Sequence, residues 1–460
     1  MAMYSPGESR YKRYLLIVLL TILAFNYVDR SALGLVLQSL KTDLSLSDTQ
    51  LGFLSGIAFA LFYSVLGIPL GRWADRGDRV RIISVTSALW SVAVMLCGSV
   101  TSFSQLLLVR IGVAVGEAGC IPPAHSLIAD YFSRAERPRA VAIYMLGGSM
   151  SMVIGYFGAG WLNELYGWRV MFTLLGLPGL GLAVLAWLTL RELRRDTSTL
   201  PLVGRASADA PAFAQESIAP ARPDLRDVGR TLWTNSTFRH LLFCFSVTFF
   251  FGYGVLQWQP AFFMRTYGMS SGELGTWFAA VYGLGGLLGT YYGGELASRY
   301  AANNERLQLR AMAIAYCCCS ILSACIYLLP NRYLALSSMM LATMTGAVAN
   351  GPLFATLQTL VPERMRAVSI AIIYLFANLI GMGLGPLAAG ALSDMLQPWA
   401  GSDSLRYALL ALSPGYCWGA WHLWCASRTV AVDLATTQSY PRGAAGRDTI
   451  PDTPSGVAVD

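Results

Sequence analysis

The sequence predicts an all-α membrane protein, with twelve transmembrane helices in two pseudo-symmetric halves of six helices each. Three observations lead to this fold class. The chain of 460 residues is 55% hydrophobic and only 13% charged, whereas a soluble domain is usually about 25% charged. Its apolar residues fall in blocks of about 20, the length that crosses roughly 30 Å of hydrocarbon. In addition, parts of the first half of the sequence recur in the second half, which indicates an internal repeat.

The apolar blocks define the expected spans in chain order. Their centres lie near residues 26, 60, 91, 117, 150 and 180 in the first half of the chain, and near 250, 284, 318, 343, 380 and 415 in the second. The first block is too long for the core of a cleavable signal peptide, and it contains two charged residues. A membrane β-barrel would show short alternating segments instead.

The internal repeat is visible at a constant spacing. The stretch SDTQLGFLSGIAFALFYSVLGIPLGRWADR starts at Ser47, and SSGELGTWFAAVYGLGGLLGTYYGGELASR starts at Ser270. Leu51 corresponds to Leu274 and Arg76 to Arg299, so the shift is 223 residues (274 − 51). Two copies in the same orientation predict two halves related by an axis along the membrane normal.

These patterns divide the chain into four parts. Residues 1–190 form the first six-helix half and residues 237–428 the second. Residues 191–236 are polar and rich in Ala, Pro, Arg and Asp, which predicts a flexible cytoplasmic linker. Residues 429–460 are also polar and are predicted to form a disordered cytoplasmic tail.

The net charge of +7 reflects the expected topology rather than a nucleic-acid partner. Arginines cluster before the first span and after the second, fourth, sixth, eighth and tenth spans. The other loops carry few basic residues, namely Lys41, Arg169, Arg265, Arg332 and Arg406. This is the positive-inside pattern. It predicts a multi-pass protein of a bacterial-type inner (plasma) membrane, with both termini in the cytoplasm.

No enzyme signature is present in the chain. It contains no nucleophile elbow GxSxG, no HExxH and no P-loop. We therefore expect no enzymatic activity, no catalytic residue and no cofactor. The nine cysteines lie mostly within the predicted spans and form no CxxC or CxxH array, which argues against a metal site. A monomer is expected.

Four charged residues within the predicted spans are the first candidates for a functional site. Asp29 and Arg30 interrupt the first apolar block, while Arg110 and Glu117 lie seven residues apart in the fourth, on one helical face. Four unpaired charges at about 3 kcal/mol each would cost roughly 12 kcal/mol in a bilayer. We therefore expect one neutral cluster in the cavity of the first half. It is either a permanent ion-pair clasp or a proton switch whose balance changes with conformation.

Two kinds of motif carry a resemblance to known transporters. The loop GRWADRGDRVR from Gly71, together with the two six-helix repeats, resembles the major facilitator superfamily and implies its fold. Within that superfamily, NYVDR at Asn26–Arg30 and RIGVAVGEAGCIPPAHSLIADYF from Arg110 are similar to Spinster-like transporters. The resemblance implies secondary active transport by alternating access, coupled to protons, of lysolipids or phosphorylated sphingoid-like amphiphiles. Sugar-acid and organic-anion symporters share NYxDR, so a small organic anion or a sugar acid is the alternative substrate of a proton-coupled transporter.

The resemblance and the residue chemistry together suggest roles for individual side chains. Proton coupling is implied for Asp29 and Glu117, and Arg30 and Arg110 are their charge partners and would favour an anionic head group once a carboxyl is protonated. Asp75 lies at the cytoplasmic end of the second span, near the positive N-terminus expected for the eleventh. It is predicted to form a gating latch there, with Arg79 beside it.

The second half shows no acid or base in the middle of a span, and its candidate cavity residues are aromatic or neutral. They are Tyr253, Gln257, Trp258, Trp277, Tyr282, Asn350, Tyr374 and Asn378. A charged half facing an aromatic half suits an amphiphile, with its head group toward the first half and its tail along the second. For any one of these aromatics, packing or a place in the interfacial belt is the alternative.

Overall fold

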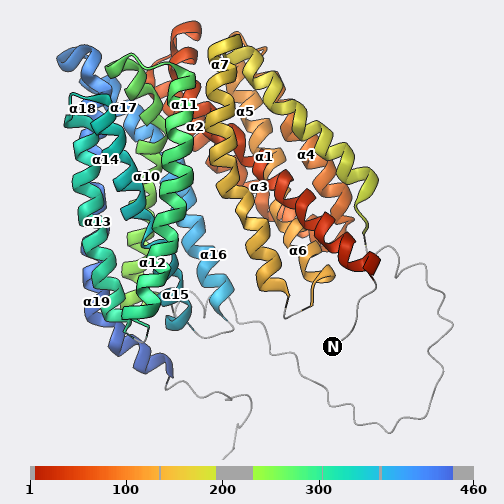
Figure 1. The fold of residues 1–460 in the computed structure, drawn as a ribbon, viewed down its shortest axis with the longest axis vertical. Coiled ribbons are helices and arrows are strands. Elements are labelled where there is room, and N and C mark those ends of the chain that lie inside the picture. Colours follow the sequence, from red (N-terminus) through yellow and green to blue (C-terminus); the bar gives the residue numbers. More distant parts are fainter. Residues whose placement is uncertain (1–5, 134–135, 193–231, 303, 362–364, 439–460) are drawn as a thin grey trace, which may run out of the picture.

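Helices account for all the regular structure in the described part of the chain, as a computed structural model shows (Figure 1). The structure describes residues 6–133, 136–192, 232–302, 304–361 and 365–438. The first half contains α1 (Pro6–Leu44), α2 (Asp48–Ser55), α3 (Ile57–Arg76), α4 (Arg79–Cys97), α5 (Phe103–Ala118), α6 (Ile121–Tyr131) and α7 (Arg137–Thr189). The long helix α7 contains two membrane passes, because the chain reverses direction at Gly167. Gly167 adopts φ 77°, a backbone conformation that glycine tolerates without strain.

The second half repeats this arrangement with more interruptions. Its elements are α10 (Ser236–Tyr267), α11 (Ser271–Ala280), η1 (Val281–Gly285), α12 (Gly286–Tyr300), α13 (Glu305–Leu328), α14 (Arg332–Ala347), α15 (Asn350–Leu360), α16 (Arg366–Phe376), η3 (Ala377–Leu384), α17 (Gly385–Ala400), η4 (Gly401–Asp403), α18 (Ser404–Leu412) and α19 (Gly415–Gln438). Breaks in the middle of spans, such as the π-helical turns η1 and η3, are common at functional sites.

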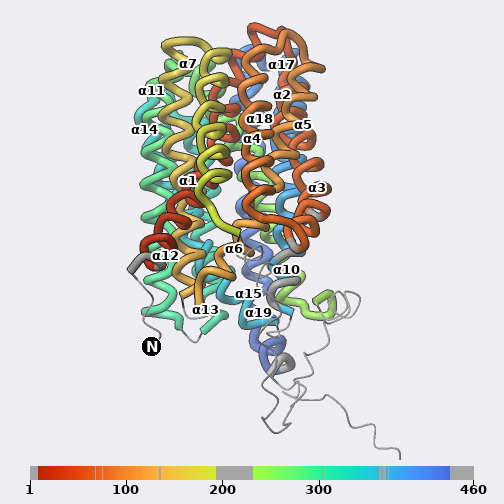
Figure 2. Tube along the Cα trace, turned by 90° about the vertical axis from the view of Figure 1, so that its right-hand side faces the viewer, coloured from red at the N-terminus to blue at the C-terminus, as the bar shows by residue number. Residues whose placement is uncertain are grey.

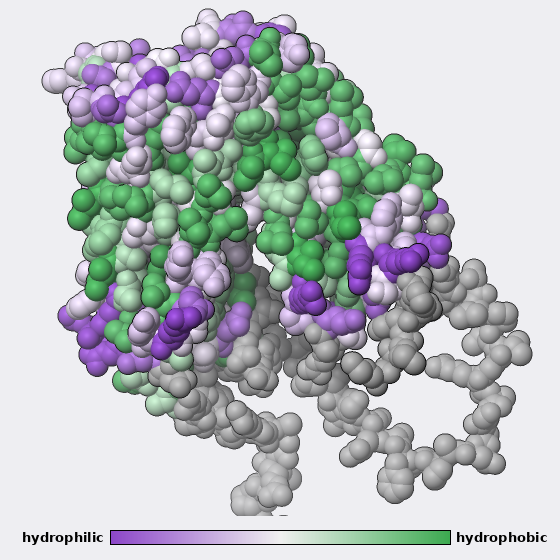
Figure 3. All heavy atoms as spheres, in the orientation of Figure 1, coloured by the Kyte–Doolittle hydropathy of each residue, from purple (hydrophilic) through white to green (hydrophobic). Residues whose placement is uncertain are grey.

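Twelve membrane passes follow from these helices. Eight described segments are long and apolar enough to cross a bilayer. Two of them, Arg137–Thr189 with 53 residues and Ile372–Ala435 with 64, are long enough to cross twice. The passes α11–α12 and α14–α15 complete the set. On the face shown in Figure 3, hydrophobic residues cover the middle of the molecule, and hydrophilic residues gather at both ends. The predicted all-α, twelve-span fold is confirmed.

The internal repeat extends to the way in which its helices begin. Ser47 caps α2 by accepting a hydrogen bond from the backbone N–H of Gln50, and Ser270 caps α11 by accepting one from Glu273. These serines occupy equivalent positions of the repeat, and each satisfies a backbone donor that a helix N-terminus leaves unpaired. The repeat therefore specifies where the second span of each half begins.

The two halves meet at one end of the bundle, which we call the closed end. This end carries the α1–α2 turn, where α2 packs on α17 and α11 packs on α7 (Figures 1 and 2). A Cβ atom on Gly52 would lie 2.4 Å from the carbonyl oxygen of Pro386, and one on Gly160 would lie 2.5 Å from that of Ser271. Glycines thus bring backbones of the two halves into direct contact.

At the opposite end, which we call the open end, the halves diverge. This end carries the start of α1 (Figure 1), and the space-filling view shows a hollow between the two halves there (Figure 3). The predicted linker, 191–236, falls largely outside the described residues. The predicted tail starts at residue 429, whereas α19 continues to Gln438; residues 439–460 lie outside the described part. The last helix is therefore about ten residues longer than the polar composition indicated, because polar residues are tolerated where a helix leaves the bilayer.

Candidate functional site

The structure brings the four predicted charged residues together as two ion pairs between α1 and α5. Arg110 Nη1 donates to Asp29 Oδ2 at 2.5 Å, and both side chains are 2% exposed. Arg30 Nη2 and Nε both donate to Glu117 Oε2, at 2.6 and 3.0 Å. Glu117 is fully buried. Each carboxylate therefore has an arginine of the other helix as its partner, and the cluster is formally neutral.

Arg30 is the member of the cluster that reaches the space between the halves. Its side chain is 23% exposed, and its Nη1 lies 3.8 Å from Met382 Sδ in η3 of the second half. Its guanidinium stacks over the rings of Tyr27, Phe59 and Tyr63, at 4.2, 4.8 and 5.0 Å. These cation–π contacts hold a weakly hydrated cation in place. Arg30 thus covers Glu117 on the side that faces the second half.

Several buried polar atoms in the cluster have no hydrogen-bond partner among the described residues. They include Asp29 Oδ1, Glu117 Oε1, Arg110 Nε and both amide atoms of Asn26. Asn26 is fully buried and lies one helical turn before Asp29. Native structures rarely leave such groups unsatisfied. The cluster can therefore accept a proton, because a carboxyl oxygen without a donor becomes a donor itself once it is protonated.

Glycine places Glu117 at this depth. A Cβ atom on Gly116 would lie 2.5 Å from the backbone nitrogen of Trp90, so only glycine allows α5 to approach α4 this closely. A similar contact joins Gly119 to Thr86, where a Cβ atom would lie 2.4 Å from the methyl carbon. Glu117, the next residue of α5, is fully buried, and Arg30 of α1 is its counter-ion.

The second half contains a cavity of about 370 Å³. Three of the eight predicted cavity residues line it: Tyr253, Tyr282 and Asn350. Its wall is mainly apolar and comes from α10, η1, α13, α14, α15 and α19, with Met152 contributed by α7 of the first half. The cavity therefore borders the contact between the two halves.

Comparison with known proteins identifies the family. Residues 19–396 match the model of the Major Facilitator Superfamily. The chain belongs to the Major Facilitator Superfamily. It is 32% identical to an MFS-type efflux pump of Mycolicibacterium smegmatis (strain ATCC 700084 / mc(2)155), over 86% of this chain and 87% of that protein. It is also 27% identical to a probable L-galactonate transporter of Escherichia coli (strain K12), over 57% of each chain.

A solved structure confirms the predicted resemblance to Spinster-like proteins. The crystal structure of a bacterial homolog to the human lysosomal transporter Spinster, in an inward-facing and unoccupied conformation, is similar to this chain with a TM-score of 0.79. The two sequences are 28% identical, and the similarity covers 94% of this chain and 99% of that one. The present chain is thus a Major Facilitator Superfamily transporter with a Spinster-like structure.

Five predicted cavity residues of this superfamily member lie outside the 370 Å³ cavity. Trp258 is fully buried, and its Nε1 donates to the carbonyl oxygen of Pro386 at 2.9 Å. Gln257 packs against Gly34 of the first half. Trp277 and Tyr374 are about 40% exposed and pack against Tyr333 and Phe354 respectively, while Asn378 is half-buried in η3.

The cavity also contains a polar residue that the sequence analysis missed. Gln259 is 3% exposed; its Oε1 accepts a hydrogen bond from Tyr282, and its Nε2 donates to Tyr327 at 3.3 Å. Gln257 and Gln259 differ by about 200° around α10, so they point to different neighbours. Sequence spacing separates the two faces, but only packing decides which face meets the cavity.

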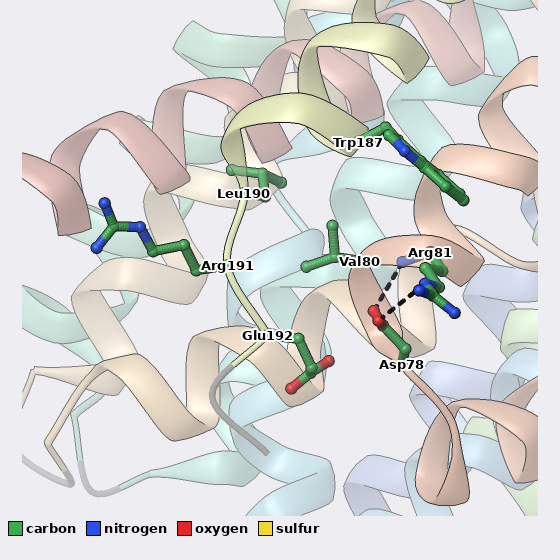
Figure 4. Close-up of a pocket in the computed structure, with 7 residues that line it drawn as sticks. All are labelled: Asp78, Val80, Arg81, Trp187, Leu190, Arg191 and Glu192. Atoms are coloured by element: carbon green, nitrogen blue, oxygen red, sulfur yellow. Dashed lines mark hydrogen bonds and ion pairs between the residues drawn. The ribbon is translucent and has the colours of Figure 1, made fainter. Parts of the chain in front are cut away.

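The predicted latch residues lie near a second pocket at the open end. That pocket has a volume of about 460 Å³ and is lined by Asp78, Val80, Arg81, Trp187, Leu190, Arg191 and Glu192 (Figure 4). Arg79 is fully buried and is paired with Asp130 of α6 and with Glu192, which follows the end of α7. Arg79 therefore holds the start of α4 against the end of α7. The side chain of Asp75 lies outside the described residues.

A buried charged cluster at the closed end was also missed. Asp48 is 1% exposed and is paired with Lys41 of its own half and Arg265 of the other half. The sequence carried one signal for it: Lys41 and Arg265 are two of the few basic residues in loops that the positive-inside pattern leaves almost neutral. Only the fold shows that a buried acid brings the two together.

Proposed function

We propose that this protein is a proton-coupled transporter that moves lysolipids or phosphorylated sphingoid-like amphiphiles across the membrane by alternating access. One observation carries the proposal. A charged cluster in the first half and a mainly apolar cavity in the second lie on either side of the contact between the halves. An amphiphile with an anionic head group and one hydrocarbon tail matches both surfaces at once. The similarity to a bacterial homolog of the lysosomal transporter Spinster supports a role in transport.

The head group would bind where Arg30 reaches the space between the halves. In the unprotonated cluster, the arginines are neutralised by Asp29 and Glu117. One added proton leaves a net charge of +1, which favours a phosphate or carboxylate near Arg30. Arg30 already lies 3.8 Å from Met382 of the second half, so an anion there would contact both halves. Proton binding and head-group binding are thereby linked.

The proton would be carried by Asp29 and Glu117 together. Each carboxylate uses one oxygen for its arginine and leaves the other without a donor among the described residues. Protonation of either carboxyl adds an O–H donor close to Asp29 Oδ1 and Glu117 Oε1, the two acceptors that lack a donor. The hydrogen bond from this donor offsets the loss of one carboxylate–arginine ion pair. The pair can therefore be loaded and unloaded without dismantling the helix packing around it.

The tail would occupy the cavity of the second half. Its apolar wall includes Val255, Leu256, Ile326, Met339 and Ala342. At about 25 cal/mol per Å² of buried apolar surface, most of the binding free energy of a long-chain substrate would come from this cavity. The hydrogen-bonded pair of Gln259 and Tyr282 would limit the depth that a tail reaches.

The distribution of arginines favours a cytoplasmic location for the open end, both termini and the linker. The described conformation is then inward-facing, like the conformation of the similar bacterial Spinster homolog. In the outward-facing state, the carboxylate of Asp75 at the end of α3 would interact with the positive N-terminus of α16 and act as a latch between the halves. Arg79 would stabilise the α3–α4 loop through its ion pairs with Asp130 and Glu192. A monomer in the inner membrane suffices for this mechanism.

A transport assay in proteoliposomes tests the proposal. The protein is reconstituted, a pH gradient is imposed, and the movement of radiolabelled lysophosphatidylglycerol and sphingosine-1-phosphate is compared with that of galactonate. The proposal predicts gradient-dependent movement of the long-chain amphiphiles alone. Movement of lysolipids that does not respond to the gradient would contradict proton coupling.

A small sugar acid is the second candidate substrate. The similarity to a probable L-galactonate transporter favours it, and the same arginines would bind a sugar carboxylate. Gradient-driven uptake of galactonate, without movement of lysolipids, would establish this alternative and leave the apolar cavity without a role in substrate binding.

A further inference from the structure

At the closed end, the buried Asp48 of the first half forms hydrogen bonds with two helices of the second half, α10 and α17. Asp48, the first residue of α2, is 1% exposed. Arg265 of α10 donates from Nη1 to Oδ2 and from Nη2 to Oδ1 of Asp48, each at 2.8 Å. The same guanidinium donates from Nε to Gln38 Oε1 at 2.6 Å. One arginine of the second half thus makes three hydrogen bonds to the first half in a planar, bidentate geometry.

Helix α17 of the second half contributes a second set of hydrogen bonds to the start of α2. Ser393 Oγ donates to Asp48 Oδ2 at 2.7 Å. The carboxylate of Asp394 accepts hydrogen bonds from the backbone N–H groups of Asp48 and Thr49, at 3.1 and 2.7 Å, and from Thr49 Oγ1 at 2.6 Å. An acid of one half therefore caps the first helix turn of the other half, where a negative charge is favoured.

Lys41 distinguishes this cluster from a simple ion pair between the halves. Its Nζ lies 2.7 Å from Asp48 Oδ1, and both residues belong to the first half. When the halves separate, Asp48 loses Arg265 but keeps Lys41. On the other side, separation releases Arg265 and Asp394 together, and these two carry opposite charges on the same half. The charges of Lys41 and Asp48 therefore sum to zero on the first half, and those of Arg265 and Asp394 sum to zero on the second.

We propose that Asp48, Lys41, Arg265 and Asp394 form a charge-exchange gate at the closed end. Asp48 and Arg265 keep this end shut, while Lys41 and Asp394 provide the counter-charges that make opening possible. Such an element has two discrete arrangements, which is what a switch between conformations requires. The inference extends the proposed function, since a gate has a role only if the two halves alternate.

The proposal predicts opposite effects for two neighbouring substitutions. Asp48→Asn removes the negative charge that forms the ion pair with Arg265. The ratio of molecules open at this end to molecules closed at this end therefore rises about tenfold or more. Lys41→Gln removes the counter-charge that Asp48 needs when Arg265 leaves, so the same ratio falls. A merely structural role for the cluster would give both variants the same direction.

Spin labels at Thr42 and Trp399, both exposed and on different halves at the closed end, measure this ratio in nanodiscs. The labels are placed in full-length protein whose native cysteines are replaced by serine, and distance distributions are recorded by pulsed electron paramagnetic resonance. Asp43→Asn is the matched control, because Asp43 pairs with Arg169 at the same end but within the first half. The control leaves the distribution unchanged.

Two results would overturn the gate: an unchanged distance distribution in Asp48→Asn, or a shift of Lys41→Gln in the same direction as Asp48→Asn. Arg265→Lys, which keeps the charge but not the bidentate geometry, gives an intermediate shift and covers the case in which Asp48→Asn does not fold. The measurement needs no substrate, so a failed lipid-transport assay leaves it valid, and a failed gate leaves the substrate assignment untouched.

Discussion

At the scale of single residues, the proposed function depends on charged side chains that are buried at the depth of the hydrocarbon core of the bilayer, where an isolated charge is costly. Asp29, Arg30, Arg110 and Glu117 avoid the cost of isolation because each is paired across two helices. The pairs are unequal. Arg110 and Asp29 are sealed within the first half, whereas Arg30 is partly exposed toward the second. In the proposed mechanism the sealed pair therefore contributes most to stability, Arg30 contacts the substrate, and Asp29 and Glu117 share the proton.

Glu117→Gln tests the proton-carrying role. The amide preserves the size of the side chain but cannot be ionised, so gradient-driven transport falls to the background rate, at least about tenfold. Folding is retained, because Arg30 can be hydrated from the space between the halves. Transport is measured in proteoliposomes with and without a pH gradient. Glu295→Gln, which affects an exposed ion pair on α12, serves as the control. Unchanged transport in Glu117→Gln removes this residue from the mechanism.

Arg110→Met tests the sealed pair. The substitution leaves the buried carboxylate of Asp29 without its cation, which lowers the free energy of unfolding by about 3–5 kcal/mol. Adding Asp29→Asn removes the unpaired charge, so the double variant regains part of the loss. Thermal unfolding in nanodiscs provides the comparison. A double variant no more stable than Arg110→Met alone shows that the pair does not interact as the geometry indicates.

At the scale of the helices, glycines decide how deeply the functional residues lie. The approach of α5 to α4 at Gly116 places Glu117 beside α1. The reversal at Gly167 divides α7 into two passes. The apolar blocks predicted where the spans lie, because about 20 apolar residues match the thickness of the bilayer. They did not predict the breaks between α2 and α3, or at η1 and η3, which arise from packing between helices.

Gly116→Ala tests the close approach of α4 and α5. The added methyl group would lie 2.5 Å from the backbone of Trp90, so the helices must separate at a cost of about 1–3 kcal/mol, and Glu117 moves with α5. Both the unfolding temperature and the transport rate decrease. Gly112→Ala is the matched control on the same helix, because its methyl group would lie 3.5 Å from Ala93, an ordinary contact. Equal behaviour of the two variants contradicts this explanation.

At the scale of the whole molecule, the two halves touch at the closed end and separate at the open end. Glycine contacts and the Asp48 cluster stabilise the closed end. The open end has the buried Arg79, which links elements of the first half only. This asymmetry is what one conformation of the proposed alternating-access cycle requires.

Asp75→Asn tests the latch proposed for the outward-facing state. Loss of the charge weakens its interaction with the N-terminus of α16 by about 0.4–1 kcal/mol, so the inward-open population rises about two- to fivefold. The change is followed by the rate at which a thiol reagent labels cysteines introduced at the cytoplasmic mouth. Asp78→Asn, three residues further along the chain at the N-cap of α4, gives the reference rate. No shift in accessibility counts against the latch.

The sequence by itself determined the membrane class, the twelve spans, the repeat and the four charged residues of the first half. These features follow from composition and local spacing, because charge in hydrocarbon is costly wherever it occurs. Tertiary structure alone decided that Arg30 pairs with Glu117, that Gln259 rather than Gln257 lines the cavity, and that Asp48 meets Arg265, 217 residues away. In a membrane protein both the lipid-facing and the inward-facing surfaces of a helix are largely apolar. The sequence therefore gives little information on how each helix is rotated about its axis, and contacts with neighbouring helices decide that rotation.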